Sequence, residues 1–168
     1  MINNKNTLQV SALLEQSELG ISRVYNERWL TNKISTAGAQ KPGLALAGYF
    51  KYLDKARIQV FGKTETGFLM QLPKDQLEKR LKDFMAMRVP CIVISENQEV
   101  HDSIIASAEK NKIPLLISDL KTSLLIPRLI VFLYRYFTEK IRIHGVMMDI
   151  MGLGILITGA SGIGKSTL

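Results

Sequence analysis

Apolar and polar residues alternate in blocks along the middle of the chain, and this pattern predicts alternating strands and helices. Three apolar runs have the length of strands and lie at residues 58–61, 89–95 and 113–117. The second and third runs are apolar without interruption, which is typical of strands buried on both faces of a parallel sheet. Helices are expected from Thr64, from Pro73 and over residues 101–112. Strands and helices that alternate in this way predict an α/β fold with a mainly parallel sheet.

Two helices have a strong amphipathic pattern. In the helix that Pro73 begins, four apolar residues recur at spacings of three and four, and we expect them to face the core: Leu77, Leu81, Phe84 and Met85. Residues 120–140 are also predicted to be largely helical, with Pro127 breaking or kinking the helix. The most apolar part of this region, residues 124–137, contains Pro127 and two arginines and is too short to span a membrane. We therefore expect a buried amphipathic helix there and no membrane association.

The N-terminal part of the chain has a less regular pattern. Residues 7–19 predict a short strand or turn and then a helix, with Ser11 as its N-cap and Gly20 at its end. Residues 28–34 predict a weak strand. Residues 35–43 contain two glycines and a proline and are expected to form a loop.

The pattern changes again near residue 138. Residues 141–150 and 155–158 predict two strands joined by a tight turn at residues 151–154, and strands joined so closely are expected to form an antiparallel hairpin. We therefore expect an N-terminal α/β domain over residues 1–137 and the start of a second domain over residues 138–168.

The composition of the 168 residues is that of a folded globular protein. Apolar residues make up 46% and charged residues 22%, which excludes a disordered chain and a collagen-like one. Residues 1–7 are polar, so no signal peptide is expected. Cys91 is the only cysteine, which rules out an intramolecular disulfide and favours a reducing, cytoplasmic setting. Because Cys91 lies within an apolar run, we expect it to be buried and unreactive.

The chain carries a net charge of +7, and much of the excess falls in residues 41–88, which hold ten basic and five acidic side chains. A basic surface can attract nucleic acid or an acidic protein. The alternative is a solvated helical face of mixed charge over residues 74–88. We favour this second interpretation, and no nucleic-acid partner, because basic and aromatic residues are not interleaved as they are in single-strand binders.

Residues 159–166 read GASGIGKS and match the phosphate-binding P-loop, G-x-x-x-x-G-K-[ST]. A buried strand is predicted to run directly into this loop. The glycines allow the backbone to approach a phosphate, and the backbone N–H groups of the loop form a concave anion site. Lys165 would neutralise the β- and γ-phosphates of a nucleotide, and the Ser166 hydroxyl would coordinate Mg²⁺. The predicted nucleotide-binding residues are Gly159, Ala160, Ser161, Gly162, Ile163, Gly164, Lys165 and Ser166.

Other candidate residues carry a weaker signal. His144 lies in the predicted hairpin, 21 residues before Lys165, where it is either near the phosphates or part of the core. Asp149 is the only carboxylate of the hairpin and is either a turn residue or a minor participant. His101 stands at a predicted helix start and is expected on the surface. The sequence shows no Ser-His-Asp grouping, metal-ligand cluster or CxxC motif.

Three segments together resemble the HPr(Ser) kinase/phosphorylase family. Residues 144–166, HGVMMDIMGLGILITGASGIGKS, are similar to the start of its kinase domain, which shows a His-Gly-Val strand, a glycine turn and a loop ending Gly-Ile-Gly-Lys-Ser. Residues 41–65 resemble its Pro-Gly-Leu-x-Leu-Ala-Gly segment and the strand after it, and residues 113–123 resemble its Ile-Pro-Leu-Leu strand. The resemblance covers residues 20–168. Many families share a P-loop, whereas the upstream segments in this order are specific.

The resemblance implies an N-terminal α/β domain similar to a domain of muramyl-peptide ligases, followed by a P-loop kinase domain, in a hexameric cytoplasmic enzyme. Such enzymes use ATP and Mg²⁺ to phosphorylate a serine of HPr, a phosphocarrier of the sugar phosphotransferase system, and remove that phosphate by phosphorolysis. The expected partner is therefore HPr or an HPr-like phosphocarrier. The family's active-site histidine falls on His144 and its P-loop lysine on Lys165, so these are the expected catalytic residues, with Ser166 on magnesium.

The sequence departs from the family at two positions of the loop and at its end. The family often has an acidic residue at the position of Ala160 and a glutamate at that of Thr167, which should tune the loop rather than change its fold. The acidic pair that would hold Mg²⁺ and act as base would follow Leu168, so we expect the chain alone neither to turn over ATP nor to bind it well. The alternatives are a regulatory or oligomerisation module without kinase activity, and an unrelated P-loop NTPase with an α/β appendage. The upstream segments count against the last.

Overall fold

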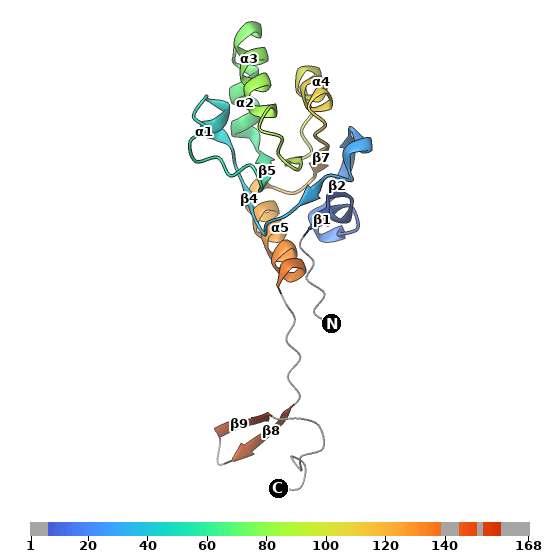
Figure 1. The fold of residues 1–168 in the computed structure, drawn as a ribbon, viewed down its shortest axis with the longest axis vertical. Coiled ribbons are helices and arrows are strands. Elements are labelled where there is room, and N and C mark those ends of the chain that lie inside the picture. The colour runs from blue at the N-terminus through green and yellow to red at the C-terminus, as the bar shows by residue number, and fades with distance from the viewer. Residues whose placement is uncertain (1–6, 139–144, 151–152, 159–168) are drawn as a thin grey trace. The chain divides into compact units, whose positions relative to one another are not determined.

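The computed structural model describes residues 7–138, 145–150 and 153–158 (Figure 1). The chain divides into two compact units, Met1–Thr138 and Glu139–Leu168. The described part of the first unit contains a five-stranded sheet with helices on both of its faces, and that of the second unit contains a pair of antiparallel strands.

The sheet of the first unit has the strand order β2 (Ile21–Tyr25), β7 (Leu115–Ser118), β6 (Ile92–Ile94), β5 (Ile58–Phe61) and β4 (Ala39–Gln40). Strands β4 to β7 run parallel to one another, whereas β2 pairs antiparallel with β7. Parallel neighbours need a crossover connection, and helices supply each one: α1 between β4 and β5, α2 and α3 between β5 and β6, and α4 between β6 and β7. The predicted α/β fold with a mainly parallel sheet is therefore confirmed.

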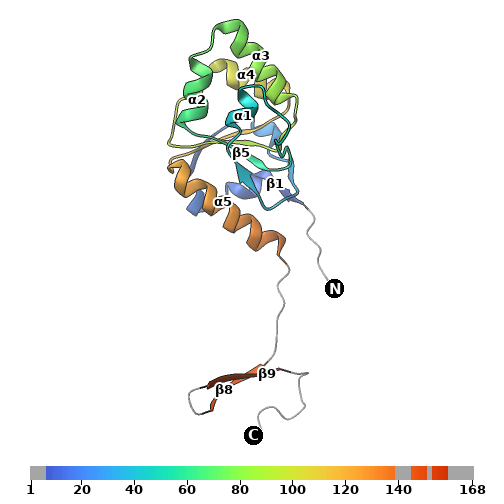
Figure 2. The same cartoon turned by 90° about the vertical axis from the view of Figure 1, so that its left-hand side faces the viewer.

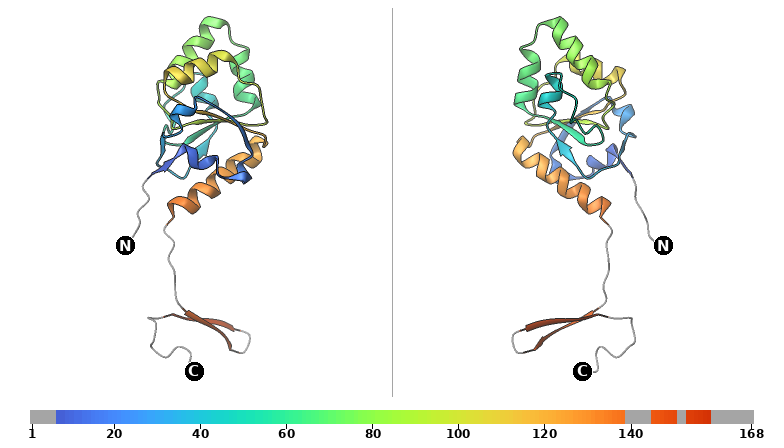
Figure 3. Two further views of the ribbon diagram at one scale, coloured as in Figure 1. Left: turned by 90° about the vertical axis from the view of Figure 1, so that its right-hand side faces the viewer. Right: turned by 60° about the vertical axis from the view of Figure 1, so that its left-hand side comes forward.

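The helices cover the two faces of the sheet unequally. Helices α1 (Gly43–Leu46), α2 (Lys63–Met70), α3 (Lys74–Met85) and α4 (Asp102–Lys110) lie on one face (Figure 2). Helix α5 (Thr122–Phe137) lies on the other face (Figure 3). That face also carries the paired short strands β1 (Leu8–Gln9) and β3 (Lys33–Ile34) and the 3-10 helices η1 (Val10–Leu13) and η2 (Ser17–Leu19). A third 3-10 helix, η3 (Glu27–Trp29), follows β2.

Each face of the sheet has its own hydrophobic core, because successive residues of a strand point to opposite faces. In β6, Ile92 and Ile94 pack toward the side of α1–α4, whereas Val93 packs toward α5. In β7, Leu116 likewise packs toward α5. Covering both faces buries every residue of these strands, and this is why they appear in the sequence as uninterrupted apolar runs.

Helix α3 confirms the amphipathic prediction. The four residues expected to face the core are all buried: Leu77, Leu81, Phe84 and Met85. Pro73 lies at the N-cap, directly before the first helical residue, where its missing N–H removes no hydrogen bond of the helix. Helices α2 and α4 begin within one residue of their expected starts.

Helix α5 runs without interruption through Pro127, so this proline does not break the helix, one of the two outcomes that the sequence pattern allowed. Pro127 is exposed and removes only the hydrogen bond that its own N–H would have donated. Three leucines of the opposite face are buried against the sheet: Leu125, Leu129 and Leu133. The buried amphipathic helix is thus confirmed. None of the described helices combines the length and the hydropathy that crossing a membrane requires.

The segment before Gly20 differs from the prediction. The short strand expected at the start of this segment is present as β1, but the expected single helix is wrong. The chain forms η1 and η2 there, and Gln9 rather than Ser11 is the N-cap of η1. Leu13 and Leu19 are both buried although they are six residues apart, and a continuous α-helix would direct them to different faces. Gly20 ends the segment as expected, with a left-handed φ of 57° that favours glycine.

The sequence pattern misses or misplaces further strands. Strand β2 is absent from the prediction because its register shifts between Ile21 and Arg23, and its residues do not alternate between buried and exposed. The weak strand expected over residues 28–34 is only the two-residue β3, and η3 occupies its start. The loop expected over residues 35–43 contains β4, which is too short to show an alternating pattern.

Candidate functional site

The second unit contains the two strands that precede the predicted nucleotide loop in the sequence. Strands β8 (Gly145–Ile150) and β9 (Leu153–Thr158) pair antiparallel over six residue pairs, with Gly145 opposite Thr158 at one end. The predicted antiparallel hairpin is therefore confirmed. The predicted turn over residues 151–154 is too long, because β9 already begins at Leu153.

The predicted site residues themselves lie outside the described part of the chain. This applies to His144 and to all of residues 159–166, including Lys165 and Ser166. Their neighbours in the sequence are described, since His144 directly precedes β8 and Gly159 directly follows β9. The strand expected to lead into the loop is present, whereas the roles assigned to the loop and to His144 stay predictions.

Asp149 does not lie in the turn of the hairpin. It pairs with Gly154 within the two strands. It also lies four residues along β8 from Gly145, which corresponds to about 14 Å of extended chain. The backbone of Asp149 is therefore at the end of the hairpin opposite to the one at which His144 and Gly159 follow. The turn position is therefore excluded for Asp149, and its part as a minor participant stays a prediction.

In the first unit, an ion pair joins the two ends of the segment 41–65. Lys41 Nζ lies 3.3 Å from Glu65 Oε2, and the same oxygen accepts a hydrogen bond of 3.0 Å from the backbone N–H of Gly62. The Glu65 side chain is only 3% exposed, whereas that of Lys41 is 40% exposed. The carboxylate thus caps the N-terminus of α2. This contact closes the segment on itself just beyond the carboxyl end of β5.

Hydroxyl and amide groups form a network beside this carboxylate. Ser95 Oγ lies 2.6 Å from Thr122 Oγ1. Gln98 accepts a hydrogen bond of 2.6 Å from the Thr66 hydroxyl and donates one of 2.8 Å to the Ser95 carbonyl. A Cβ at Gly62 would lie 2.7 Å from Thr122 Oγ1, so a larger residue at that position would displace this hydroxyl. The network links α2, the end of β6 and the start of α5, and we assign it a structural role.

The opposite edge of the sheet carries a basic cavity. Its volume is about 610 Å³, and five basic residues line it: Lys33, Lys55, Arg88, Lys110 and Lys112. Uncharged residues complete the lining, and no carboxylate belongs to it. The lining segments include those that lead into β5, β6 and β7, so the cavity lies at the amino ends of these parallel strands. We call the cavity with its five cations the basic bowl.

The basic bowl is the feature that the sequence pattern does not reveal directly. The charge count leads us to favour a solvated helical face as the explanation of the excess positive charge in residues 41–88. In the structure, Lys55 and Arg88 line the bowl together with three cations from outside that range. A usable signal exists in the sequence. A lysine or arginine stands within three residues before each of the three predicted apolar strands. Since the amino ends of parallel strands share one edge of the sheet, these cations converge.

The remaining candidates have structural roles. Cys91 is fully buried, and burial raises the pKa of its thiol well above the usual range, which keeps the thiol protonated and unreactive as expected. His101 is exposed at the N-cap of α4, where its Nδ1 accepts a hydrogen bond of 3.2 Å from the backbone N–H of Ser103. Within the described residues, no group of three or more His, Cys, Asp or Glu side chains is placed to hold a metal ion.

Comparison with known proteins finds one family that matches both units. The family model described as "HPr Serine kinase N terminus" matches residues 8–133, and the one described as "HPr Serine kinase C-terminal domain" matches residues 135–168. The chain is 38% identical over 154 residues to the HPr kinase/phosphorylase of Bacillus subtilis. It is 40% identical over 155 residues to the HPr kinase/phosphorylase of Listeria monocytogenes.

These alignments cover most of this chain but only part of the relatives. They span 92% and 90% of this chain, and 49% and 48% of the two relatives, so the chain spans about half the length of the curated relatives it matches. Among solved structures, the CBS and DRTGG domains of a Clostridium perfringens pyrophosphatase, complexed with diadenosine tetraphosphate, give a TM-score of 0.49 at 14% identity. This match covers 77% of this chain and 48% of that one. At this score the similarity supports no argument about this chain.

Proposed function

Because the chain belongs to the HPr serine kinase family, we propose that the protein uses ATP to phosphorylate a serine of the phosphocarrier HPr and removes that phosphate by phosphorolysis. Two findings support the proposal. The N-terminal and C-terminal family models match in succession and leave almost no residue between them. The relatives that align with over nine-tenths of the chain carry the name HPr kinase/phosphorylase.

The observation that carries the proposal is the register of β8 and β9. Gly145 pairs with Thr158, and paired Cα atoms of antiparallel strands are about 4.5–5.5 Å apart. His144 and Gly159 are the next residues of the chain, and consecutive Cα atoms are about 3.8 Å apart. In the sequence, the histidine and the loop therefore adjoin two residues that are paired across the strands. The histidine and the phosphate-binding loop thus start from the same end of the hairpin.

Within this proposal, each residue of the site has its own task. The backbone N–H groups of residues 159–166 bind the phosphates, and Lys165 offsets the charge of the β- and γ-phosphates. Ser166 offers a hydroxyl oxygen, which is the kind of hard ligand that Mg²⁺ prefers. When bound, the ion would supply further positive charge to the phosphates. His144 would donate a hydrogen bond to the phosphoryl group.

We further propose that the protein acts as a hexamer in the cytoplasm, in the regulation of carbon metabolism. The family resemblance supports the hexamer and the partner, HPr or an HPr-like phosphocarrier. The single, buried Cys91 supports a reducing compartment. Size-exclusion chromatography with light scattering measures the oligomer directly, and a monomer at micromolar concentration would contradict this part of the proposal.

The experiment that tests the kinase activity uses the protein as its own cell makes it, incubated with ATP, Mg²⁺ and purified HPr. We expect a phosphoserine on HPr, detected by intact mass and located by peptide mapping. Lys165→Ala and His144→Ala should each lower the rate about 100-fold, because each removes one group that stabilises charge on the phosphates. Addition of inorganic phosphate to phosphorylated HPr should remove the phosphate and release pyrophosphate.

Lys121→Ala provides the matched control. Lys121 is an exposed lysine directly before α5, outside the predicted site, and its loss should leave the rate unchanged. A Lys165→Ala variant with the parental rate would show that residues 159–166 are not the nucleotide site. If the parental protein does not phosphorylate HPr at all, the alternative of a regulatory or oligomerisation module without kinase activity takes the place of this proposal.

A further inference from the structure

We propose that the basic bowl binds a small ligand that carries two or more phosphate groups. All residues of the bowl belong to the first unit, and none of them is part of the predicted nucleotide loop in residues 159–166. The proposal does not depend on the kinase activity, and it gives the N-terminal part of the chain a binding function of its own.

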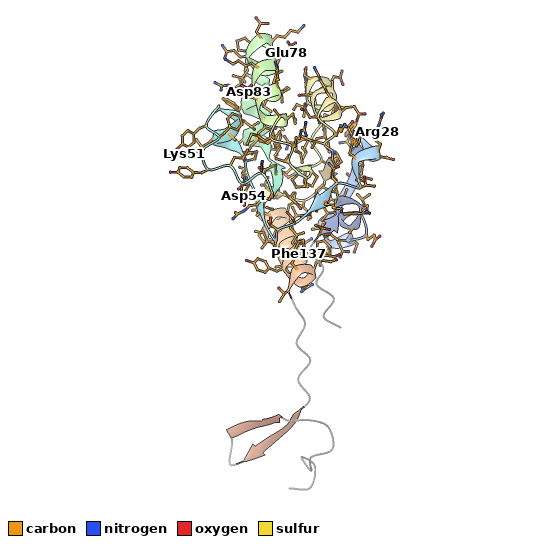
Figure 4. The ribbon with its side chains drawn as sticks, in the orientation of Figure 1. Arg28, Lys51, Asp54, Glu78, Asp83 and Phe137 are labelled. Carbon is orange, nitrogen blue, oxygen red and sulfur yellow. The ribbon has the colours of Figure 1, made fainter. Side chains whose placement is uncertain are left out.

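Within the described residues, the five cations of the bowl have no carboxylate partner. In the described part of the chain, none of the ion pairs includes a cation of the bowl. The two acidic residues adjacent to the bowl in sequence are engaged elsewhere. Asp54 accepts a hydrogen bond of 3.0 Å from Arg57, and Glu109 pairs with Arg28 at 3.1 Å (Figure 4 labels Asp54 and Arg28). Like charges around one cavity repel one another, and a bound polyanion would offset that repulsion.

Helix ends account for only part of this clustering. Arg88, Lys110 and Lys112 lie at or just after the C-termini of α3 and α4, where a cation offsets the partial negative charge of the helix end. Lys33 belongs to β3, and Lys55 lies in the turn before β5. Neither of these two lysines stands at the end of a helix. The bowl therefore holds more positive charge than the two helix ends require.

Two of the cationic residues have a backbone conformation that glycine adopts more readily than other residues. Arg88 has a φ of 53° and Lys112 a φ of 62°, both in the left-handed region. Each lies in a short connection between a helix and the next strand, where glycine is the usual residue. The sequence has a long cationic side chain at both positions instead, and both line the bowl. Backbone strain of this kind is concentrated at binding and catalytic sites.

One asparagine ties these two connections together. Asn32 Nδ2 donates a hydrogen bond of 3.2 Å to the Pro90 carbonyl and one of 2.8 Å to the Lys112 carbonyl. Pro90 lies between α3 and β6, and Lys112 lies between α4 and β7. The cations are thus carried on segments whose relative positions are fixed before a ligand arrives. This arrangement reduces the entropy that is lost when a ligand binds.

The volume and charge of the bowl define the class of ligand. A cavity of about 610 Å³ lies in the range of about 300–1,000 Å³ that is typical of small-molecule sites. A phosphate monoester carries a charge of about −1.5 to −2, so two or three phosphate groups match the five cations. A nucleic-acid strand would require aromatic side chains for stacking, and the lining of the bowl contains none.

The test uses inorganic pyrophosphate and tripolyphosphate as probes, with orthophosphate for comparison. It is made on the full chain carrying Lys165→Ala, so that the predicted P-loop does not contribute. Equilibrium dialysis gives the Kd. Trp29 is the only tryptophan, and its ring centroid lies 5.5 Å from Lys112 Nζ, so a ligand that moves this ammonium group changes the fluorescence of Trp29. We expect saturable binding that is tightest for tripolyphosphate, with the same midpoint in both measurements.

Two double variants separate the bowl from general charge effects. Lys33→Gln/Lys55→Gln removes two cations of the bowl and leaves the helix ends unchanged. Lys74→Gln/Lys121→Gln removes two exposed lysines that lie outside the lining, so the net charge falls by the same amount. We expect the Kd of the first variant to be at least fivefold that of the second. Far-UV circular dichroism and the urea midpoint show whether both variants are folded.

A ratio below fivefold contradicts the proposal, because general charge would then explain the binding. The proposal is also wrong if the probes do not bind saturably, or if they bind without changing the fluorescence of Trp29. The proposed kinase activity and the proposed ligand site in the bowl can each be contradicted without the other. Loss of HPr phosphorylation in the Lys165→Ala variant of the protein as its own cell makes it, with saturable binding of tripolyphosphate retained, would establish two sites in one protein.

Discussion

Glu65 joins the two ends of the segment 41–65 through one carboxylate oxygen, and substituting it tests which of the two contacts of that oxygen stabilises the fold. That oxygen lies 3.0 Å from the backbone nitrogen of Gly62 and 3.3 Å from Lys41 Nζ. We predict that Glu65→Ala lowers the free energy of unfolding by about 2–4 kcal/mol, whereas Glu65→Gln lowers it by about 1 kcal/mol. The hydrogen bond to the backbone, rather than the ion pair, should account for the difference.

These magnitudes follow from the burial of each partner. A hydrogen bond to a charged group contributes about 1.5–3 kcal/mol, and a buried N–H left without a partner costs about 1–3 kcal/mol. Gly62 is buried, so Glu65→Ala loses part of the hydrogen-bond energy and also leaves the Gly62 N–H partly without a partner. Lys41 is 40% exposed, and water screens its ion pair to about 0–1 kcal/mol. Glu65→Gln keeps a carbonyl oxygen that can accept the Gly62 hydrogen bond and loses only the charge.

Urea unfolding followed by Trp29 fluorescence measures these changes, because the only tryptophan belongs to the first unit. Lys41→Met is the control and should lower the free energy of unfolding by less than about 1 kcal/mol. The double variant Glu65→Gln/Lys41→Met completes a cycle whose coupling energy should also be below about 1 kcal/mol. A loss for Lys41→Met as large as that for Glu65→Ala would refute the reasoning, since the ion pair would then stabilise the segment.

Two further predictions concern the cores. Phe84 is fully buried with its ring centroid 5.6 Å from that of Phe61, so Phe84→Ala should lower the free energy of unfolding by about 3–5 kcal/mol. Urea titration measures this loss, and Val131→Ala, at a side chain 47% exposed, should change it by about 0.5 kcal/mol or less. Cys91 should not react with a thiol reagent in the native protein but should react fully in urea, because burial raises the pKa of its thiol. Rapid labelling of the native protein would contradict this burial.

The elements that the sequence predicts correctly are those whose local pattern matches their environment. The stripe Leu77, Leu81 and Phe84 repeats with the period of a helix and meets one face of the sheet. Strands β6 and β7 are covered on both faces, so their apolar runs are visible without knowledge of their partners. The P-loop motif is also local, because its chemistry depends on a short run of consecutive residues.

The elements that the sequence misses depend on partners distant in the chain. Strand β4 is defined by the pairing of Ala39 with Ile58 and has no pattern of its own. The basic bowl likewise gathers Lys33 and Lys112 in one lining although they are far apart in the sequence, which a count of charges along the chain cannot show. The hairpin falls between these cases. Its strands are visible in the sequence, but the pairing of Gly145 with Thr158 requires the register.

The place of β2 at the edge of the sheet has a consequence for the order of folding. Ile21 pairs with Ser118, ninety-seven residues later in the chain, whereas β5, β6 and β7 pair with neighbours much closer in sequence. Closing a longer loop loses more chain entropy, so the nearer pairings form first. A ribosome makes β2 before any strand it can pair with, and β2 has to wait until β7 has joined the growing sheet. We therefore expect β2, the first of the five strands to be made, to be the last to enter the sheet.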